Sequence, residues 1–325
     1  MERRPLGNTG LTVSALGFGC GNVGGLMVRG THEDQVAAVQ RAMDAGITYF
    51  DTAPSYGNGL SETHLGEVLK ELNAWGRVTV GTKLRIDPGE DPVTAVRNSV
   101  NESLKRLQTD HVHLVQLHNR IGRGDGAISP GRLPAVVDAM RTVQREGLVR
   151  NIGCTALGDT AAVVGAVTAR YFNTAQCYFN AANPSSGHAG IAHGAQDLGG
   201  VIDAAAAGQM GVIGIRVLAA GALVASMERA PIAGGTGGAL TAGADYESDV
   251  GRAQQLLALA HELGLESAME LSLRFVLAKP GVSTALVGYS DRQQLEDAIR
   301  WAERGPLPPD AVQRILRWGA QAVTA

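Results

Sequence analysis

Short stretches rich in apolar and β-branched residues recur eight times along this 325-residue chain, and each is followed by a stretch with helical spacing. Runs such as VHLVQL and VIGI are apolar on successive residues, which is typical of strands covered on both faces of a parallel sheet. Eight alternating units predict an α/β fold and favour a (β/α)8 TIM barrel over the main alternative, a doubly wound sheet. The predicted strands are 15–19, 47–51, 78–83, 112–118, 149–154, 174–178, 212–216 and 284–287. The predicted helices are 33–45, 61–73, 91–107, 132–146, 159–168, 194–208, 249–278 (as two helices) and 291–303.

The start of the chain and two helix starts carry turn and capping signals. The segment RRPLGNTGLTVS predicts an N-terminal β-hairpin around Asn8-Thr9-Gly10, which could plug the bottom of the barrel. Thr31-x-x-Asp34 and Ser290-x-x-Gln293 resemble capping boxes. With 45% hydrophobic residues the chain can bury a large core, and α/β barrels of this length are routinely one domain, so we expect residues 1–325 to form one.

Composition also excludes several classes of protein. The net charge is −3 with no basic block, which argues against a nucleic-acid partner. No apolar run approaches the roughly 18 to 20 residues needed to span a membrane, and the start MERRPLGNTG lacks the apolar core of a secretory signal. The three cysteines are widely spread with no CxxC, which fits reduced thiols. We therefore expect a cytoplasmic protein. The sequence contains no heptad repeat that would indicate an oligomeric state.

Glycine is over-represented, whereas aromatic residues are scarce. The 43 glycines are about twice the ordinary share, and several lie at expected strand ends. Others concentrate in PIAGGTGGALTAGA, residues 231–244, which we expect to be a flexible cover over the site. Aromatic residues make up only 4% of the chain, so few aromatic walls are expected around a substrate.

Three consecutive predicted strands end in side chains that carry chemistry. Strand 47–51 ends in Asp51, strand 78–83 in Lys83 and strand 112–118 in His118, and Tyr56 follows in the loop after the first of them. In a (β/α)8 barrel the carboxyl ends of the strands form the functional rim, so these side chains should meet there. Any one of them alone is more often a cap, a solvated charge or a turn residue than a catalyst; the joint pattern is what favours a site.

This combination suits proton transfer at a carbonyl group. Asp51 can anchor Lys83, and a lysine cation beside a phenol is expected to lower the pKa of Tyr56. Tyr56 could then act as general acid/base on an oxygen to which His118 donates. Side chains cannot supply the hydride that a carbonyl reduction needs, so a nicotinamide cofactor is implied. The rim lacks a carboxylate/histidine cluster for a metal, and we expect none.

The segments that carry these residues resemble the aldo-keto reductase superfamily. The similar segments are GITYFDTAPSYGNG-LSETHLGEVLK, VGTK and VHLVQLH, and the resemblance runs from LGFGCG near the start to VGYSDRQQLEDAI near the end. It implies a (β/α)8 barrel that binds a nicotinamide nucleotide, usually NADP(H), without a Rossmann domain. It also implies Asp51, Tyr56, Lys83 and His118 as the catalytic tetrad.

The resemblance implies cofactor-binding residues too, although several positions depart from the family pattern. Thr155-Ala156 replaces the usual Ser-Asn, GIRVLAAGAL lacks the usual stacking aromatic, and Gly288-Tyr289-Ser290 lacks the cation that often binds the 2′-phosphate. These departures leave NAD possible beside NADP. The implied cofactor residues are Gly19, Cys20, Thr155, Gln176, Arg216, Leu218, Gly221, Gly288, Ser290, Gln294 and Asp297.

The implied substrate is an aldehyde, a ketone or a sugar, since NGLSE after the tyrosine resembles bacterial aldose or fucose dehydrogenases. Its expected walls are Val23, Met27, Asn58, Asn119 and Arg120, together with 231–244. Two alternatives stay open. One is a non-catalytic cofactor-binding regulatory subunit, like the potassium-channel β subunits of the family. The other is an unrelated barrel isomerase acting on phosphorylated sugars.

Overall fold

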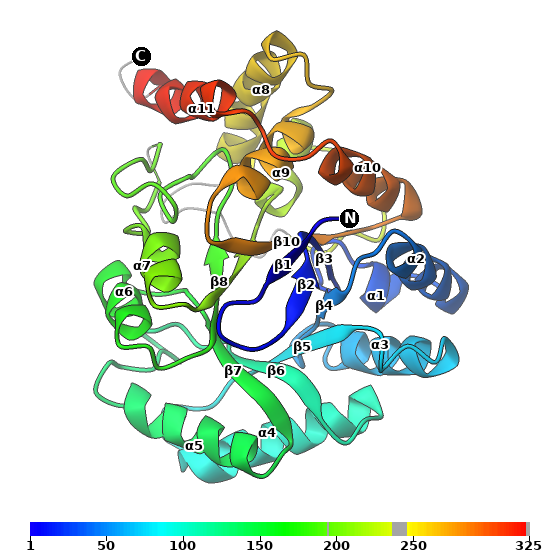
Figure 1. Cartoon of the computed structure of the whole chain (residues 1–325), viewed down its shortest axis with the longest axis vertical. Helices are drawn as coiled ribbons and strands as arrows, with labels where there is room; N and C mark the ends of the chain where they lie inside the picture. The colour runs from blue at the N-terminus through cyan, green and yellow to red at the C-terminus, as the bar shows by residue number, and fades with distance from the viewer. Residues whose placement is uncertain (194, 236–245, 323–325) are drawn as a thin grey trace.

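Eight parallel strands form a closed barrel in the computed structural model, which describes residues 1–193, 195–235 and 246–322 (Figure 1). The last strand pairs with the first, so the order around the barrel is β10-β3-β4-β5-β6-β7-β8-β9. All eight predicted strands are confirmed to within two residues, and the doubly wound alternative is wrong because the sheet has no edge. The barrel strands are β3 (Leu16–Gly19), β4 (Tyr49–Asp51), β5 (Thr79–Leu84), β6 (Val112–Leu117), β7 (Val149–Thr155), β8 (Thr174–Tyr178), β9 (Gly211–Ile215) and β10 (Val282–Gly288).

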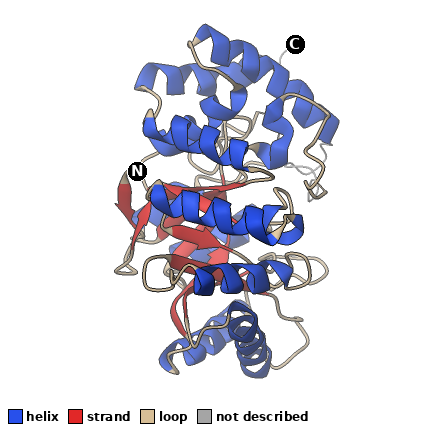
Figure 2. Ribbon diagram, turned by 90° about the vertical axis from the view of Figure 1, so that its right-hand side faces the viewer, coloured by secondary structure: helices blue, strands red, loops and turns tan. Residues whose placement is uncertain are grey.

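Helices surround the strands on the outside (Figure 2). The predicted helices are confirmed except for 194–208: the observed helix begins only at Val201, because Gly199 and Gly200 both have φ of 65° and end the preceding loop in the left-handed region. The helices observed at the predicted places are α2 (His32–Asp44), α3 (Leu60–Glu71), α4 (Pro92–Leu107), α5 (Leu133–Arg145), α6 (Thr160–Thr168), the shorter α7 (Val201–Ala207), α8 (Tyr246–Glu262), α9 (Ala268–Ala278) and α10 (Arg292–Glu303). Three elements were not predicted: α1 (Leu26–Arg29), the 3₁₀ segment η1 (Ala219–Val224) and α11 (Pro309–Ala322).

Of the two expected capping boxes, one forms in part: Thr31 is the N-cap of α2, and its hydroxyl makes both bonds to Asp34. The Thr31 hydroxyl accepts from the Asp34 backbone N–H at 3.2 Å and donates to the Asp34 carboxylate at 2.7 Å. The other prediction is wrong: Asp291, not Ser290, is the N-cap of α10 and accepts from the Gln294 N–H at 2.8 Å. Ser290 instead donates to the Gly24 carbonyl oxygen at 2.6 Å, because that carbonyl from a distant loop lies within its reach.

The N-terminal hairpin closes one end of the barrel, as the sequence predicts (Figures 1 and 2). β1 (Arg3–Pro5) and β2 (Thr12–Ser14) pair antiparallel. Leu6 and Val13, both fully buried, form a cluster with three residues of the barrel interior, namely Tyr49, Leu114 and Ile213. A bound molecule must therefore enter from the opposite end, where the parallel strands terminate.

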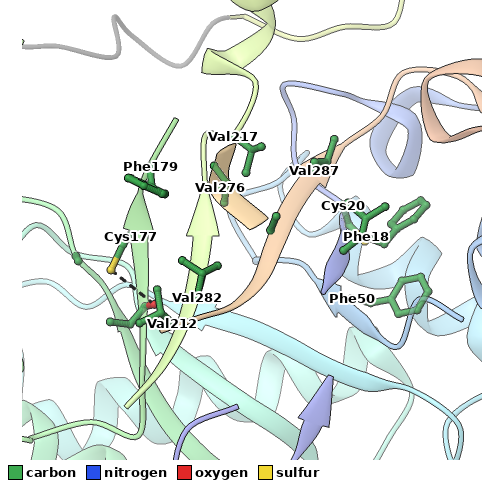
Figure 3. Packing of buried hydrophobic residues seen from close by; sticks show 14 of the residues in the cluster. Phe18, Cys20, Phe50, Cys177, Phe179, Val212, Val217, Val276, Val282 and Val287 are labelled. Atoms are coloured by element: carbon green, nitrogen blue, oxygen red, sulfur yellow. Dashed lines mark hydrogen bonds between the residues drawn. The ribbon is translucent and has the colours of Figure 1, made fainter. Parts of the chain in front are cut away.

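The main core lies between the barrel and its helices (Figure 3). At Gly214 of β9 an added Cβ would approach a methyl group of Val276 in α9 to 3.1 Å, so helix and strand pack closely.

Cys20, Cys154 and Cys177 are free and buried, and burial raises the pKa of Cys154 to about 12, which keeps it as a thiol. Of the helices described, none has the length and apolarity to cross a bilayer.

Candidate active site

Asp51 and Lys83 form a buried ion pair at the carboxyl ends of neighbouring strands. Asp51 ends β4 and pairs in register with Gly81 of β5, two residues before Lys83. The Lys83 ammonium donates to Asp51 Oδ1 and, at 2.9 Å, to the Thr52 carbonyl oxygen. The two residues are 1% and 2% exposed, so neither charge is screened by water.

The second oxygen of Asp51 accepts hydrogen bonds from three side chains, which lie on β4, β6 and β8. Asp51 Oδ2 accepts from Tyr49 Oη at 2.9 Å, from Gln116 Nε2 at 3.0 Å and from Gln176 Nε2 at 2.7 Å. With Lys83 on Oδ1, the carboxylate is held from β4, β5, β6 and β8. A Cβ at Gly81 would lie 2.6 Å from Tyr49 Oη, so only glycine leaves room for this network.

Tyr49 and Gln116 are functional neighbours that sequence reasoning missed. Both face the barrel interior two residues before a rim residue, Tyr49 before Asp51 and Gln116 before His118. Alternation of side chains along a strand would have flagged them, because a polar residue at that spacing points to the same face as the rim residue. Gln176, which was predicted as a cofactor ligand, donates one amide N–H to Asp51 and also lines the cavity described below.

Tyr56 and His118 complete the cluster at the rim. The Lys83 Nζ atom lies 4.8 Å from the centroid of the Tyr56 ring. The rings of Tyr56 and His118 meet edge to face with centroids 6.3 Å apart. The loop that carries Tyr56 is fixed by Asn22, whose Oδ1 accepts from the Gly57 N–H at 2.9 Å. The four residues expected to meet at the rim are therefore brought together.

The charges of the cluster follow from burial and from each other. Burial raises the pKa of Tyr56 above its ordinary value of 10, and the nearby Lys83 charge offsets only part of this rise. The expectation of a lowered pKa for Tyr56 is therefore wrong, because burial raises this pKa more than Lys83 lowers it. Burial alone would discharge Lys83, but Asp51 outweighs it and raises the lysine pKa. Burial, Lys83 and Arg85 lower the pKa of His118 to about 3, so its imidazole is neutral near pH 7.

A cavity of about 1270 Å³ opens above this cluster. Ten of the eleven residues expected to bind a cofactor line it: Gly19, Thr155, Gln176, Arg216, Leu218, Gly221, Gly288, Ser290, Gln294 and Asp297. Cys20 does not, because its side chain packs in the core. Of the expected substrate walls, Val23 and Arg120 line the cavity. Met27 is buried, and Asn119 is hydrogen-bonded to the backbone of Ile86. Asn58 lies on an exposed turn.

The lining has unsatisfied polar groups that a dinucleotide could use. The hydroxyl oxygens of Thr155 and Tyr289 are buried and have no hydrogen-bond partner among the described residues. Thr155 lies beside Gln176 in the register of β7 and β8, whereas Tyr289 follows β10. Arg216 lies over the Tyr178 ring at 5.5 Å, between these two regions of the cavity wall. Unsatisfied buried hydroxyls cost stability unless something pairs with them, so the lining fits a polar ligand.

Aromatic side chains concentrate on this cavity, contrary to expectation. Tyr56, Tyr178, Tyr246, Tyr289 and Trp301 all line it. The low aromatic content of the chain misled because composition does not say where the few rings gather.

The glycine-rich segment 231–244 adjoins the cavity in its described part. Arg29 Nε donates to the Ile232 carbonyl oxygen at 2.7 Å, and the Gly234 N–H donates to the Asn22 carbonyl oxygen at 3.0 Å. Residues 236–244 lie outside the described residues, and the cover over the site stays a prediction. Within 1–193, 195–235 and 246–322, no group of three or more His, Cys, Asp or Glu side chains is placed to hold a metal ion.

Fold and site together define a (β/α)8-barrel protein with a charged cluster at the carboxyl ends of its strands and a large cavity above it. The model of the Aldo/keto reductase family matches residues 15–318, and the chain belongs to that family.

Several relatives match part of the chain. It is 40% identical over 161 residues to an L-galactose dehydrogenase of Arabidopsis thaliana, which covers 48% of the chain and 49% of the relative. It is 34% identical over 170 residues to a D-threo-aldose 1-dehydrogenase of a Pseudomonas species, covering 44% and 50%. The chain thus spans about half the length of these curated relatives. The holo form of an aldo-keto reductase from Bacillus halodurans has the same fold, with a TM-score of 0.74 at 23% identity over 98% of this chain and 96% of that one.

Proposed function

We propose that this protein is an NAD(P)(H)-dependent oxidoreductase that interconverts a carbonyl group (of an aldehyde, ketone or sugar) and an alcohol, with Tyr56 as general acid/base. One observation carries the proposal: a buried Asp51–Lys83 ion pair lies beneath the Tyr56 ring, with a neutral His118 at its edge, at the floor of one large cavity. Membership of the aldo/keto reductase family supports it.

Each residue of the cluster has a role in proton transfer. In reduction, the Tyr56 hydroxyl gives its proton to the carbonyl oxygen, and in oxidation the phenolate removes the proton of the alcohol. Lys83, fixed by Asp51 and by the Thr52 carbonyl, stabilises the phenolate that forms. His118 donates a hydrogen bond to the same substrate oxygen and orients it. A bound nicotinamide supplies or accepts the hydride.

The cofactor would be held along the wall formed by β7 to β10 and the start of α10. Thr155 and Gln176 suit its carboxamide, Arg216 to Gly221 its pyrophosphate, and Ser290, Gln294 and Asp297 its adenosine end. NADP is the first cofactor to test and NAD the second. The charged residue that α10 places against the cavity is Asp297, an acid and not a cation that would favour the 2′-phosphate of NADP. We therefore expect the affinities for NADPH and NADH, measured by fluorescence titration, to lie within about tenfold of each other. A preference of a thousandfold either way would contradict this assignment.

The substrate class is tested by turnover. The names of the two dehydrogenase relatives favour a sugar, so the panel should include L-galactose, fucose and other aldoses with NADP and NAD, and simple aldehydes with NADPH and NADH. Absorbance of the reduced nicotinamide reports both directions. Cofactor binding without any turnover would instead support the regulatory-subunit alternative, against which the complete cluster argues. Family membership argues against an unrelated isomerase. The three free thiols favour a cytoplasmic location.

The two directions should respond differently to pH. The pKa of Tyr56 is raised above 10, so the proton needed for reduction is present across neutral pH. We expect kcat/KM for reduction to be flat between about pH 6 and pH 9, and kcat/KM for oxidation to rise about tenfold per pH unit there, because oxidation needs the phenolate. His118 has its pKa lowered to about 3 and adds no inflection in this range. A bell-shaped reduction profile with an inflection near pH 6.5 would contradict the assignment.

A further inference from the structure

Two arginines continue the strands that carry the cluster. Arg85 follows Lys83 by two residues and Arg120 follows His118 by two, and both side chains are exposed and line the large cavity. Both arginines thus line the same cavity as Asp51 and His118, just beyond the carboxyl ends of β5 and β6.

A buried asparagine holds the two extensions together. Asn119 is 5% exposed; its Oδ1 accepts from the Ile86 N–H at 3.1 Å and its Nδ2 donates to the Ile86 carbonyl oxygen at 2.9 Å. The His118 N–H also donates to the Leu84 carbonyl oxygen at 2.8 Å. Ile86 and Asn119 adjoin Arg85 and Arg120 in sequence. The Asn119 amide thus ties together the two segments that follow β5 and β6, on which Arg85 and Arg120 lie.

The two positive charges have no counter-charge among the described residues. Neither guanidinium makes an ion pair or a hydrogen bond with any residue that the structure describes. Three carboxylates line the cavity: Asp51 is engaged by Lys83, Asp297 by Arg300 at 2.6 Å, and Glu228 lies in the segment after η1. Arg85 is close enough to His118 to help lower its pKa. The guanidinium groups that line this part of the cavity present forked donors that match a carboxylate or a phosphate.

Position in the barrel separates this pair from the proposed cofactor wall. In the strand order, β5 lies four places from β9, and β6 lies four places from β10. In an eight-stranded barrel that is the opposite side. An anion held by Arg85 and Arg120 is therefore a group other than the phosphates of a dinucleotide along β9, β10 and α10.

From this geometry we infer that Arg85 and Arg120 form an anion subsite for the substrate, so that the carbonyl compound carries a carboxylate or phosphate several bonds from its reacting carbon. The inference rests on the proposed function for the place of the reacting carbon, at Tyr56. Asn119 acts as a positioning residue for the pair.

Matched substrate pairs test the subsite and distinguish the two anions. Succinate semialdehyde against butanal reports a carboxylate, and glyceraldehyde 3-phosphate against glyceraldehyde reports a phosphate. We expect the anionic member of at least one pair to have a kcat/KM 10- to 100-fold higher, falling as salt rises. In the double variant Arg85→Gln/Arg120→Gln the ratio should approach one. In Arg123→Gln, an exposed arginine of the same loop that does not line the cavity, the ratio should stay at the wild-type value.

Equal kcat/KM within both pairs for the wild type, or a ratio retained in the double variant, would overturn the inference. If the wild type turns over no carbonyl at all, the proposed function fails, and calorimetry with succinate and inorganic phosphate decides the subsite separately. Binding of either anion that weakens at least tenfold in the double variant supports the subsite, and equal or absent binding overturns it.

Discussion

Replacing Tyr56 with phenylalanine is expected to lower kcat/KM for carbonyl reduction by about 10² to 10⁴-fold, the usual contribution of a general acid. The ring stays in place over Lys83 and beside His118, so the cavity keeps its shape while the transferable proton is lost. The measurement is steady-state turnover of the best aldehyde of the panel, together with fluorescence titration of the cofactor.

Cofactor affinity should change less than about threefold in Tyr56→Phe, since the phenol oxygen is not needed to hold a dinucleotide. Tyr171→Phe is the matched control, because Tyr171 lies beside Asn8 at the hairpin end of the barrel. It should leave turnover at the wild-type level. Full activity in Tyr56→Phe would exclude this tyrosine as the acid/base.

Replacing Lys83 with methionine should have the largest effect on stability. The substitution leaves the Asp51 carboxylate buried without its counter-charge, and breaking a buried pair in this way costs about 3–5 kcal/mol. The free energy of unfolding from denaturant titration measures it. Turnover should fall as well, because no cation remains to stabilise the Tyr56 phenolate.

Two variants sharpen that prediction. Adding Asp51→Asn to Lys83→Met removes the uncompensated charge and should recover part of the lost stability, but not the activity. Lys105→Met breaks an exposed pair with Glu102, 2.6 Å apart, and should cost less than about 1 kcal/mol. If Lys83→Met were no less stable than Lys105→Met, the Asp51–Lys83 pair would not be the buried, unscreened pair described above.

Local sequence patterns predicted the barrel because each unit repeats the same two signals. An apolar run of strand length followed by a 3.6-residue period appears eight times, and the pattern does not depend on distant contacts. The hairpin was predicted from Asn8-Thr9-Gly10 for the same reason. By contrast, the start of α7 at Val201 depends on two glycines in the left-handed region, and the N-cap of α10 shifted to Asp291 because Ser290 is engaged by Gly24.

The site residues show the same difference between features that local sequence predicts and features that distant contacts decide. Asp51, Lys83 and His118 could be predicted because each ends a strand, and parallel strands present their ends at one rim. Cys20, although next to Gly19 at the same rim, turns its side chain into the core. The sign of the Tyr56 pKa shift could not be predicted from its neighbours, because burial is the larger effect and depends on every segment around the ring.

By itself, the sequence determined the order of strands and helices, the end of the barrel at which Asp51, Lys83 and His118 lie, and the residue types gathered there, since these follow from local periodicity and from the direction of parallel strands. Only the tertiary structure decided which donors hold Asp51, that Asn119 ties two loops together, and that Arg85 and Arg120 line the cavity with no ion pair in the part of the chain that the structure describes. Closure of the barrel pairs Leu16 with Ala285, and it brings Gln176 to Asp51 from 125 positions away; no local pattern encodes such contacts.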